Sequence, residues 1–167
     1  MSKDIVKTDI VRPLVTAKQA AQEWQQFEEL KKALLTPQDY QPIQGTRYMK
    51  KSAFRKIAVY FGLSDEITEQ ERTDRENGSF FWRIVVKATA PNGRTNVGVG
   101  MCDSKERKFA HVEHDVYATA HTRAKNRAIS DMIAGGAVSA EEMQHKPRKP
   151  PTRVNGKTLK NGRLIVE

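Results

Sequence analysis

Several features common in proteins are scarce in this chain of 167 residues, and each absence excludes a class of protein. Cys102 is the single cysteine, so no disulfide forms within the chain, as is typical of an intracellular protein. No apolar run approaches the ~18 residues needed to cross a bilayer, and no signal-peptide pattern opens the chain. We therefore expect a cytoplasmic protein without membrane contact.

Motifs of catalysis are also missing. No Gly-rich phosphate loop ending in Lys-Ser/Thr occurs, which disfavours ATP-driven strand exchange, and no Gly-x-Ser-x-Gly or Cys/His nucleophile arrangement occurs. His111, Glu113, His114 and Asp115 lie close in sequence, but a zinc site needs about four convergent ligands, or three plus water, and no second cluster accompanies them. Acidic residues near the first predicted strand, where a nuclease would hold Mg²⁺, are explained by a solvated edge. We expect no enzyme, no metal and no cofactor.

Positive charge, in contrast, is abundant and uneven. The formal net charge is +9. Residues 145–167 hold seven Lys or Arg against one Glu, a net +6, while the other 22 basic and 19 acidic residues leave only +3 for the rest. Such an excess indicates a polyanionic partner. We interpret 1–15 as an N-terminal arm, 16–144 as a single α+β nucleic-acid-binding domain and 145–167 as a flexible basic tail.

Two helices are predicted in the first part of the chain. The first, about 17–35, begins at a capping box of Thr16 and Gln19 and carries an apolar stripe that suits a core or an interface. A loop with one short extended piece occupies 37–49. The second helix follows it over 50–61, with an apolar face that includes Phe61 and a basic start.

Three strands come next, at about 66–75, 80–89 and 95–102. The first is polar and is expected at a sheet edge, and turn sequences join the three into an antiparallel sheet. Gly98 and Gly100 share one face of the third strand, which indicates that another backbone comes close, either the following helix or a nucleic-acid strand.

A long helix over 114–134 is the element around which the rest is organised. Two apolar strips flank a narrow polar lane on it, so we expect the helix to be largely covered, with Arg123 and Arg127 facing out through a slot. Guanidinium groups held in this way match the oxygens of phosphate. The alternative is a buried helix whose arginines pair with carboxylates such as Asp131. The fold class is therefore α+β, with a three-stranded antiparallel sheet packed by a long C-terminal helix and preceded by helices.

Cations on the helices and the sheet form the candidate binding surface, and aromatic side chains at Tyr48, Tyr60 and Phe81 offer stacking surfaces. A cationic groove with aromatic edges suits single-stranded nucleic acid, because charge holds the backbone and rings accept any base. A merely solvated basic face is the alternative for the second helix. The candidate nucleic-acid-binding residues are Lys50, Lys51, Arg55, Arg83, Lys87, Arg123, Lys125 and Arg127.

The order of these elements resembles the single-strand annealing superfamily of recombination mediators, which includes the Rad-type annealers, phage Erf proteins and bacterial DdrA. The resemblance covers about 37–142. It rests on the layout and on the segments Lys50–Lys56, Ala90–Arg94 and Thr122–Ala128, and the pattern is similar to that of archaeal or viral members.

The resemblance implies a homo-oligomeric ring or filament that binds single-stranded DNA in a basic groove and anneals complementary strands without ATP, in recombination and repair at the nucleoid. It implies groove contacts from Arg123, Lys125 and Arg127 and inner contacts from Lys50, Lys51 and Arg55. On this interpretation, changing Arg123 and Arg127 to Ala weakens binding and leaves the fold intact. Duplex DNA and RNA stay open as partners. The alternative function is a non-oligomeric basic accessory or chromatin protein that binds nucleic acid through its cationic tail.

Overall fold

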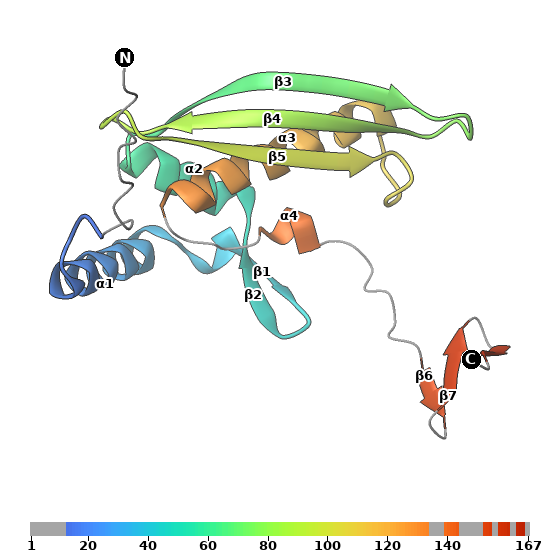
Figure 1. Ribbon diagram of the computed structural model, residues 1–167, viewed down its shortest axis with the longest axis horizontal. Helices are drawn as coiled ribbons and strands as arrows, with labels where there is room; N and C mark the ends of the chain where they lie inside the picture. The colour runs from blue at the N-terminus through green and yellow to red at the C-terminus, as the bar shows by residue number, and fades with distance from the viewer. Residues whose placement is uncertain (1–12, 134–138, 144–151, 155–156, 161–162, 166–167) are drawn as a thin grey trace, which may run out of the picture.

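The computed structural model describes residues 13–133 and 139–143, and the backbone of three short strands between 152 and 165. Strands β3 (Ser64–Asp74), β4 (Phe80–Thr89) and β5 (Thr95–Asp103) form an antiparallel sheet in that order. Helix α3 (Val112–Met132) runs along one face of this sheet (Figure 1). The α+β fold expected from the sequence, with the long helix packed on three antiparallel strands, is confirmed.

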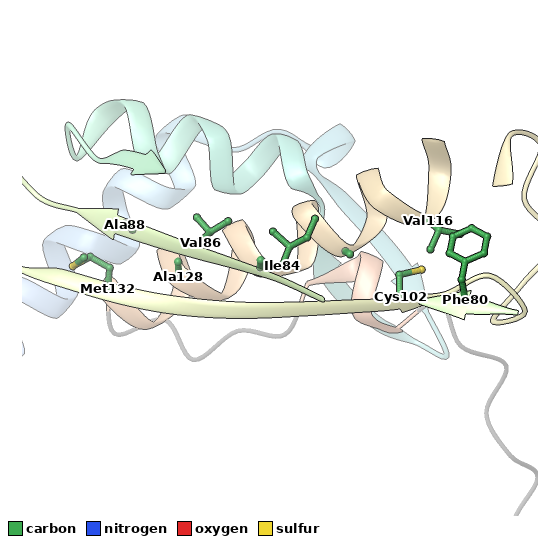
Figure 2. Packing of buried hydrophobic residues seen from close by; sticks show 10 residues of the cluster. Phe80, Ile84, Val86, Ala88, Cys102, Val116, Ala128 and Met132 are labelled. Atoms are coloured by element: carbon green, nitrogen blue, oxygen red, sulfur yellow. The ribbon is translucent and has the colours of Figure 1, made fainter. Parts of the chain in front are cut away.

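Small residues allow α3 to lie very close to β5. A Cβ atom added at Gly98 would overlap the backbone oxygen of Ala124, and one added at Gly100 would overlap the backbone oxygen of Ala120. Of the two neighbours that the sequence left open for these glycines, the structure therefore selects the helix. Apolar side chains of β4, such as Ile84, fill the remaining space between sheet and helix (Figure 2).

Strand β3 forms one edge of the sheet and is exposed along nearly its whole length, as its polar sequence predicted. Its contacts with α3 are polar rather than apolar. Lys125 pairs with Asp65 at 2.6 Å, and the hydroxyl of Tyr117 donates to Gln70 at 2.9 Å. The helix core therefore lies under β4 and β5, and side-chain hydrogen bonds attach the third strand.

A second apolar cluster joins α2 (Lys51–Tyr60) to the back of α3. Phe54 and Ile57 of α2 are fully buried there, and Ile129 is the contribution of α3. Phe61, which the sequence assigned to this buried face, is 37% exposed because it follows the last helical residue, where the chain turns at Gly62 with a φ of 62°. The prediction for Phe61 was wrong for that reason.

Helix α1 (Ala17–Leu34) begins at the predicted capping box, with the Thr16 hydroxyl accepting from the Gln19 N–H at 3.3 Å. None of its residues is buried, and Trp24 is 49% exposed. Phe27 of α1 contacts Phe61, the residue after α2, and their ring centroids lie 6.0 Å apart. Of the apolar stripe of α1, Leu34 at its end packs against the second apolar cluster, and for the exposed remainder the interface interpretation remains.

The segment expected to be a loop contains more structure than predicted. A short 3-10 helix, η1 (Pro37–Asp39), leads into a hairpin of β1 (Tyr40–Ile43) and β2 (Thr46–Met49). Gln44 and Gly45 form its tip with φ angles of 52° and 82°, the left-handed values that a two-residue hairpin turn requires. A Gln-Gly pair is a weaker turn signal than Asn-Gly, so the hairpin was missed.

The C-terminal part of the chain contains one short helix and three short strands. Ser139 leads into a helical turn as expected, α4 (Ala140–Met143). The backbone beyond it includes β6 (Thr152–Val154), β7 (Lys157–Lys160) and β8 (Arg163–Ile165), an antiparallel sheet where the sequence predicted a flexible tail. Most of the predicted N-terminal arm lies outside the described residues. Within the described part of the chain, no helix has the length and apolar character to cross a bilayer.

Candidate nucleic-acid interface

Arg123 is held inside the protein and does not face outward. Its side chain is 4% exposed and forms a bidentate ion pair with Glu106, whose side chain is 12% exposed. It also donates to the backbone oxygens of Met101, at 2.7 Å, and Glu141, at 3.0 Å. Burial alone lowers the pKa of a guanidinium, but the Glu106 carboxylate outweighs it and the pKa of Arg123 is raised. The prediction that Arg123 is displayed through a slot was wrong, because a glutamate of the loop before α3 folds over it.

Arg127 is about half exposed, yet its guanidinium is also occupied. Two of its nitrogens approach one carboxylate oxygen of Glu142, at 2.9 and 2.7 Å, and the third donates to the backbone oxygen of Val99 at 2.6 Å. The oxygens of Val99 and Met101 lie on the free edge of β5. The two arginines of α3 therefore donate hydrogen bonds to backbone oxygens on that edge. The carboxylates that neutralise them are Glu106 and Glu142 rather than Asp131.

The three other predicted cations on the sheet and α3 are paired as well. Arg83 lies 2.7 Å from Glu69 and Lys87 lies 3.2 Å from Glu66, both across the β3–β4 pair. Lys125 is bound to Asp65, as described above. These pairs are partly exposed, so each contributes about 0–1 kcal/mol and can exchange its carboxylate for phosphate at small cost. The predicted groove across the sheet is therefore electrostatically close to neutral.

The cations at the start of α2 differ from those on the sheet and α3 in their ion pairing. Lys50 occupies the N-cap position, and Lys51 and Arg55 are exposed. Among residues 13–133 and 139–143, the side chains of these three form no ion pair. No carboxylate among the described residues therefore has to be displaced before they can bind phosphate, which distinguishes them from the five cations on the sheet and α3.

A concave surface of about 550 Å³ lies where the start of α2 faces the outer side of α3. We call it the α2–α3 hollow. Lys51 borders it from α2, Arg107 and Lys108 border it from the loop after β5, and His114 borders it from the first turn of α3. Thr122 contributes further along α3. The two acidic residues among its lining are Asp115 and Glu141, and both are engaged in hydrogen bonds within the protein.

The hollow also holds an aromatic ring with a cation above it. Phe109 is half-buried, and the Arg107 guanidinium carbon lies 4.9 Å from its ring centroid while one of its nitrogens donates to the Thr119 hydroxyl at 3.1 Å. Further along α3, burial first and then the nearby Lys125 lower the pKa of His121. The lysine and arginine side chains that border the hollow are Lys51, Arg107 and Lys108.

Sequence reasoning missed Arg107, Lys108 and Phe109 because it treated 103–113 as a connection carrying both charges. A signal was present, since three consecutive residues combine two cations with an aromatic ring, the pairing that stacking on nucleic acid uses.

The expected cap at the start of α3 is present. The Asp115 carboxylate accepts from the His111 N–H at 3.0 Å, and this bond, followed by the contact with His114, lowers the pKa of Asp115.

A metal centre finds no support around this capping cluster. In the described ranges, no three residues among His, Cys, Asp and Glu are placed to hold a metal ion.

In comparisons with known proteins, no family model matches the chain and no curated sequence matches it. The fold and the side chains of this interface are therefore the basis on which we infer a function.

Proposed function

We propose that this protein binds single-stranded DNA without ATP and anneals complementary strands as a homo-oligomer in recombination and repair. The observation that supports it is the α2–α3 hollow, where Lys51, Arg107 and Lys108 border a concave surface that contains the ring of Phe109. The ammonium groups of Lys51 and Lys108 can neutralise phosphates, and an aromatic ring accepts any base, so this combination suits a flexible single strand better than a duplex. The binding residues on α3 and the sheet become secondary in this proposal, because their charges are already paired.

The fold adds a second line of support. The order of a basic helix, three antiparallel strands and a long helix is the layout on which the resemblance to the single-strand annealing superfamily rests. Annealing itself needs no catalytic group: neutralised phosphates let two strands approach, and base pairing supplies the free energy.

Exposed apolar side chains support the oligomeric part of the proposal. Trp24 on α1 is 49% exposed, and Val97 on the sheet face opposite α3 is 52% exposed. Exposed apolar side chains on separate faces suit surfaces that another protein covers. A second copy of the chain is the simplest partner for both.

A binding experiment with a matched control tests the site. Fluorescence anisotropy with a labelled 30-nucleotide mixed-sequence strand, measured between 0.05 and 0.3 M salt, compares wild type with Lys51→Ala plus Lys108→Ala. Each lost phosphate contact on a single strand lowers the salt slope by about 0.7, so the double variant is expected to lose about 1.4 in slope and about 25-fold in affinity at 0.1 M salt. Lys18→Ala plus Lys32→Ala on α1 removes the same charge from exposed positions and is expected to change little.

The remaining parts of the proposal have separate readouts. Annealing of complementary labelled strands is followed by energy transfer without ATP, and light scattering gives the oligomeric state. No binding by wild type at 0.05 M salt, or equal losses in the two double variants, would overturn the proposal. A chain ending at residue 144 distinguishes the alternative: a monomer that loses binding without 145–167 is the basic accessory protein that uses its tail.

A further inference from the structure

The short helix α4 carries two carboxylates that bind groups otherwise suited to phosphate. One oxygen of Glu141 accepts from the Lys51 backbone N–H, in the first turn of α2, at 2.8 Å, and the other accepts from the Asn126 amide at 3.3 Å. Glu142 binds the Arg127 guanidinium as described above. Two adjacent acidic residues therefore neutralise the start of one helix and the half-exposed arginine of another.

The segment around these carboxylates is docked firmly on the body of the protein. Ser139 and Ala140 are fully buried, and Ser139 forms a parallel β-bridge with Met49 at the end of β2. The Ser139 hydroxyl donates to the second carboxylate oxygen of Glu142 at 3.2 Å, which orients that side chain toward Arg127. We call residues 139–143 the acidic strap.

The strap lies between two concave surfaces. Glu141 borders the α2–α3 hollow. Glu142 borders a second concavity of about 350 Å³, the β5 hollow, which Arg75, Phe81 and Arg127 also line. Arg75 stacks over the Phe81 ring, with its guanidinium carbon 5.1 Å from the ring centroid, and pairs with Asp103 at 2.6 Å. Asp103 and Glu106 also line this concavity, and Arg127 is the lining cation whose charge residues 139–143 neutralise. Residues 139–143 therefore lie between these two concavities and supply an acidic side chain to each of them.

We propose that the acidic strap is an autoinhibitory contact, in which Glu142 and Glu141 compete with nucleic-acid phosphate and hold a single strand out of the β5 hollow. This inference rests on the proposed function and concerns the regulation of that site. When the strap leaves, Arg127 and the start of α2 become available, and a strand bound in the α2–α3 hollow continues into the β5 hollow.

The physical basis is competition between a tethered anion and a free one. A carboxylate on the same chain acts at an effective concentration on the order of millimolar or above, so phosphate must displace it. The apparent dissociation constant is therefore the intrinsic one divided by the fraction of molecules with the strap open. The Arg127–Glu142 contact is half exposed on the arginine side, which keeps the displacement energetically accessible.

Glu142→Gln tests this competition, because it removes the charge and keeps the shape. With Arg127 freed for one phosphate, the salt slope for the labelled strand is expected to rise by about 0.7 and the affinity at 0.1 M salt by about fivefold. Glu23→Gln, an exposed position on α1, changes net charge equally and is expected to have the wild-type slope. Circular dichroism confirms that both variants are folded.

A cross-link gives the opposite perturbation. Met49→Cys with Ser139→Cys places two cysteines on bridged strand positions, where the backbones lie about 5 Å apart and a disulfide fits. Burial raises the pKa of the Cys102 thiol to about 11, so this native cysteine stays out of the pairing. The oxidised form, with the strap locked, is expected to bind the strand at least fivefold more weakly than the same protein after reduction.

The outcomes separate the two proposals. If wild type binds and neither Glu142→Gln nor the cross-link changes the affinity or the slope, the strap is only structural and this inference is overturned. If wild type and every variant fail to bind at 0.05 M salt, the proposed function itself is overturned. Binding by Glu142→Gln alone supports both, with the strap closed in most wild-type molecules.

Discussion

Replacing Arg123 by alanine is expected to destabilise the fold rather than to remove a DNA contact. The guanidinium is 4% exposed and serves three acceptors: the Glu106 carboxylate and the backbone oxygens of Met101 and Glu141. Removing it leaves the Glu106 carboxylate, itself 12% exposed, without its bidentate partner. Breaking a buried pair from one side costs about 3–5 kcal/mol, a large part of the ~5–15 kcal/mol that holds a typical domain folded.

Urea denaturation followed by circular dichroism at pH 7 measures this cost. Arg127→Ala is the matched comparison, because that side chain is 48% exposed and its loss is expected to cost about 1 kcal/mol. Pairing Arg123→Met with Glu106→Gln removes both charges together, so most of the lost stability should return. The double variant therefore separates the loss of a partner from the loss of side-chain volume.

One result would refute this reasoning about Arg123. If Arg123→Ala unfolds at the wild-type urea concentration while single-strand binding disappears, the guanidinium acts at the interface and the buried ion pair is dispensable. The sequence-based expectation, that changing Arg123 and Arg127 weakens binding and spares the fold, would then hold. The structure favours the opposite for Arg123, because its four nearest acceptor contacts are all internal.

Two further predictions concern stability. Gly100→Ala is expected to lower the free energy of unfolding by about 1–3 kcal/mol or more, since the added methyl overlaps backbone atoms of α3, whereas Thr95→Ala at an exposed position of the same strand should cost little. A wild-type melting temperature for Gly100→Ala would contradict the packing. Burial raises the pKa of Asp39, but hydrogen bonds, led by that of Lys56, outweigh it and hold the pKa well below its usual 3.8. A lowered folded-state pKa means that Asp39 stabilises the protein fully above about pH 4 and less as the pH falls further, so Asp39→Asn should be destabilised at pH 7 and approach wild type in acid. A difference in unfolding free energy that stays constant from pH 7 to pH 3 would exclude this role.

The sequence by itself determined α1, α2, α3 and the three strands of the main sheet, because local patterns are enough for these elements. Alternation in 80–89 defined β4, the capping box of Thr16 defined the start of α1, and glycines sharing one strand face indicated a close backbone. The long helix was correctly expected to be largely covered, since its apolar strips flank a narrow polar lane.

Tertiary structure alone decided which cations are available to bind phosphate. Arg123 and Lys51 look equally basic in the sequence, but Arg123 meets a glutamate from the loop before α3, whereas among the described residues the Lys51 ammonium meets no carboxylate. The carboxylates that pair with the predicted cations of the sheet and α3 lie 14 or more positions away in sequence, such as Glu69 from Arg83 and Glu106 from Arg123, and no periodic pattern encodes those distances. Apolar patterns that predict helices and strands are local in the sequence. The electrostatic surface depends on which charged residues the folded chain brings into contact, and these are distant in sequence.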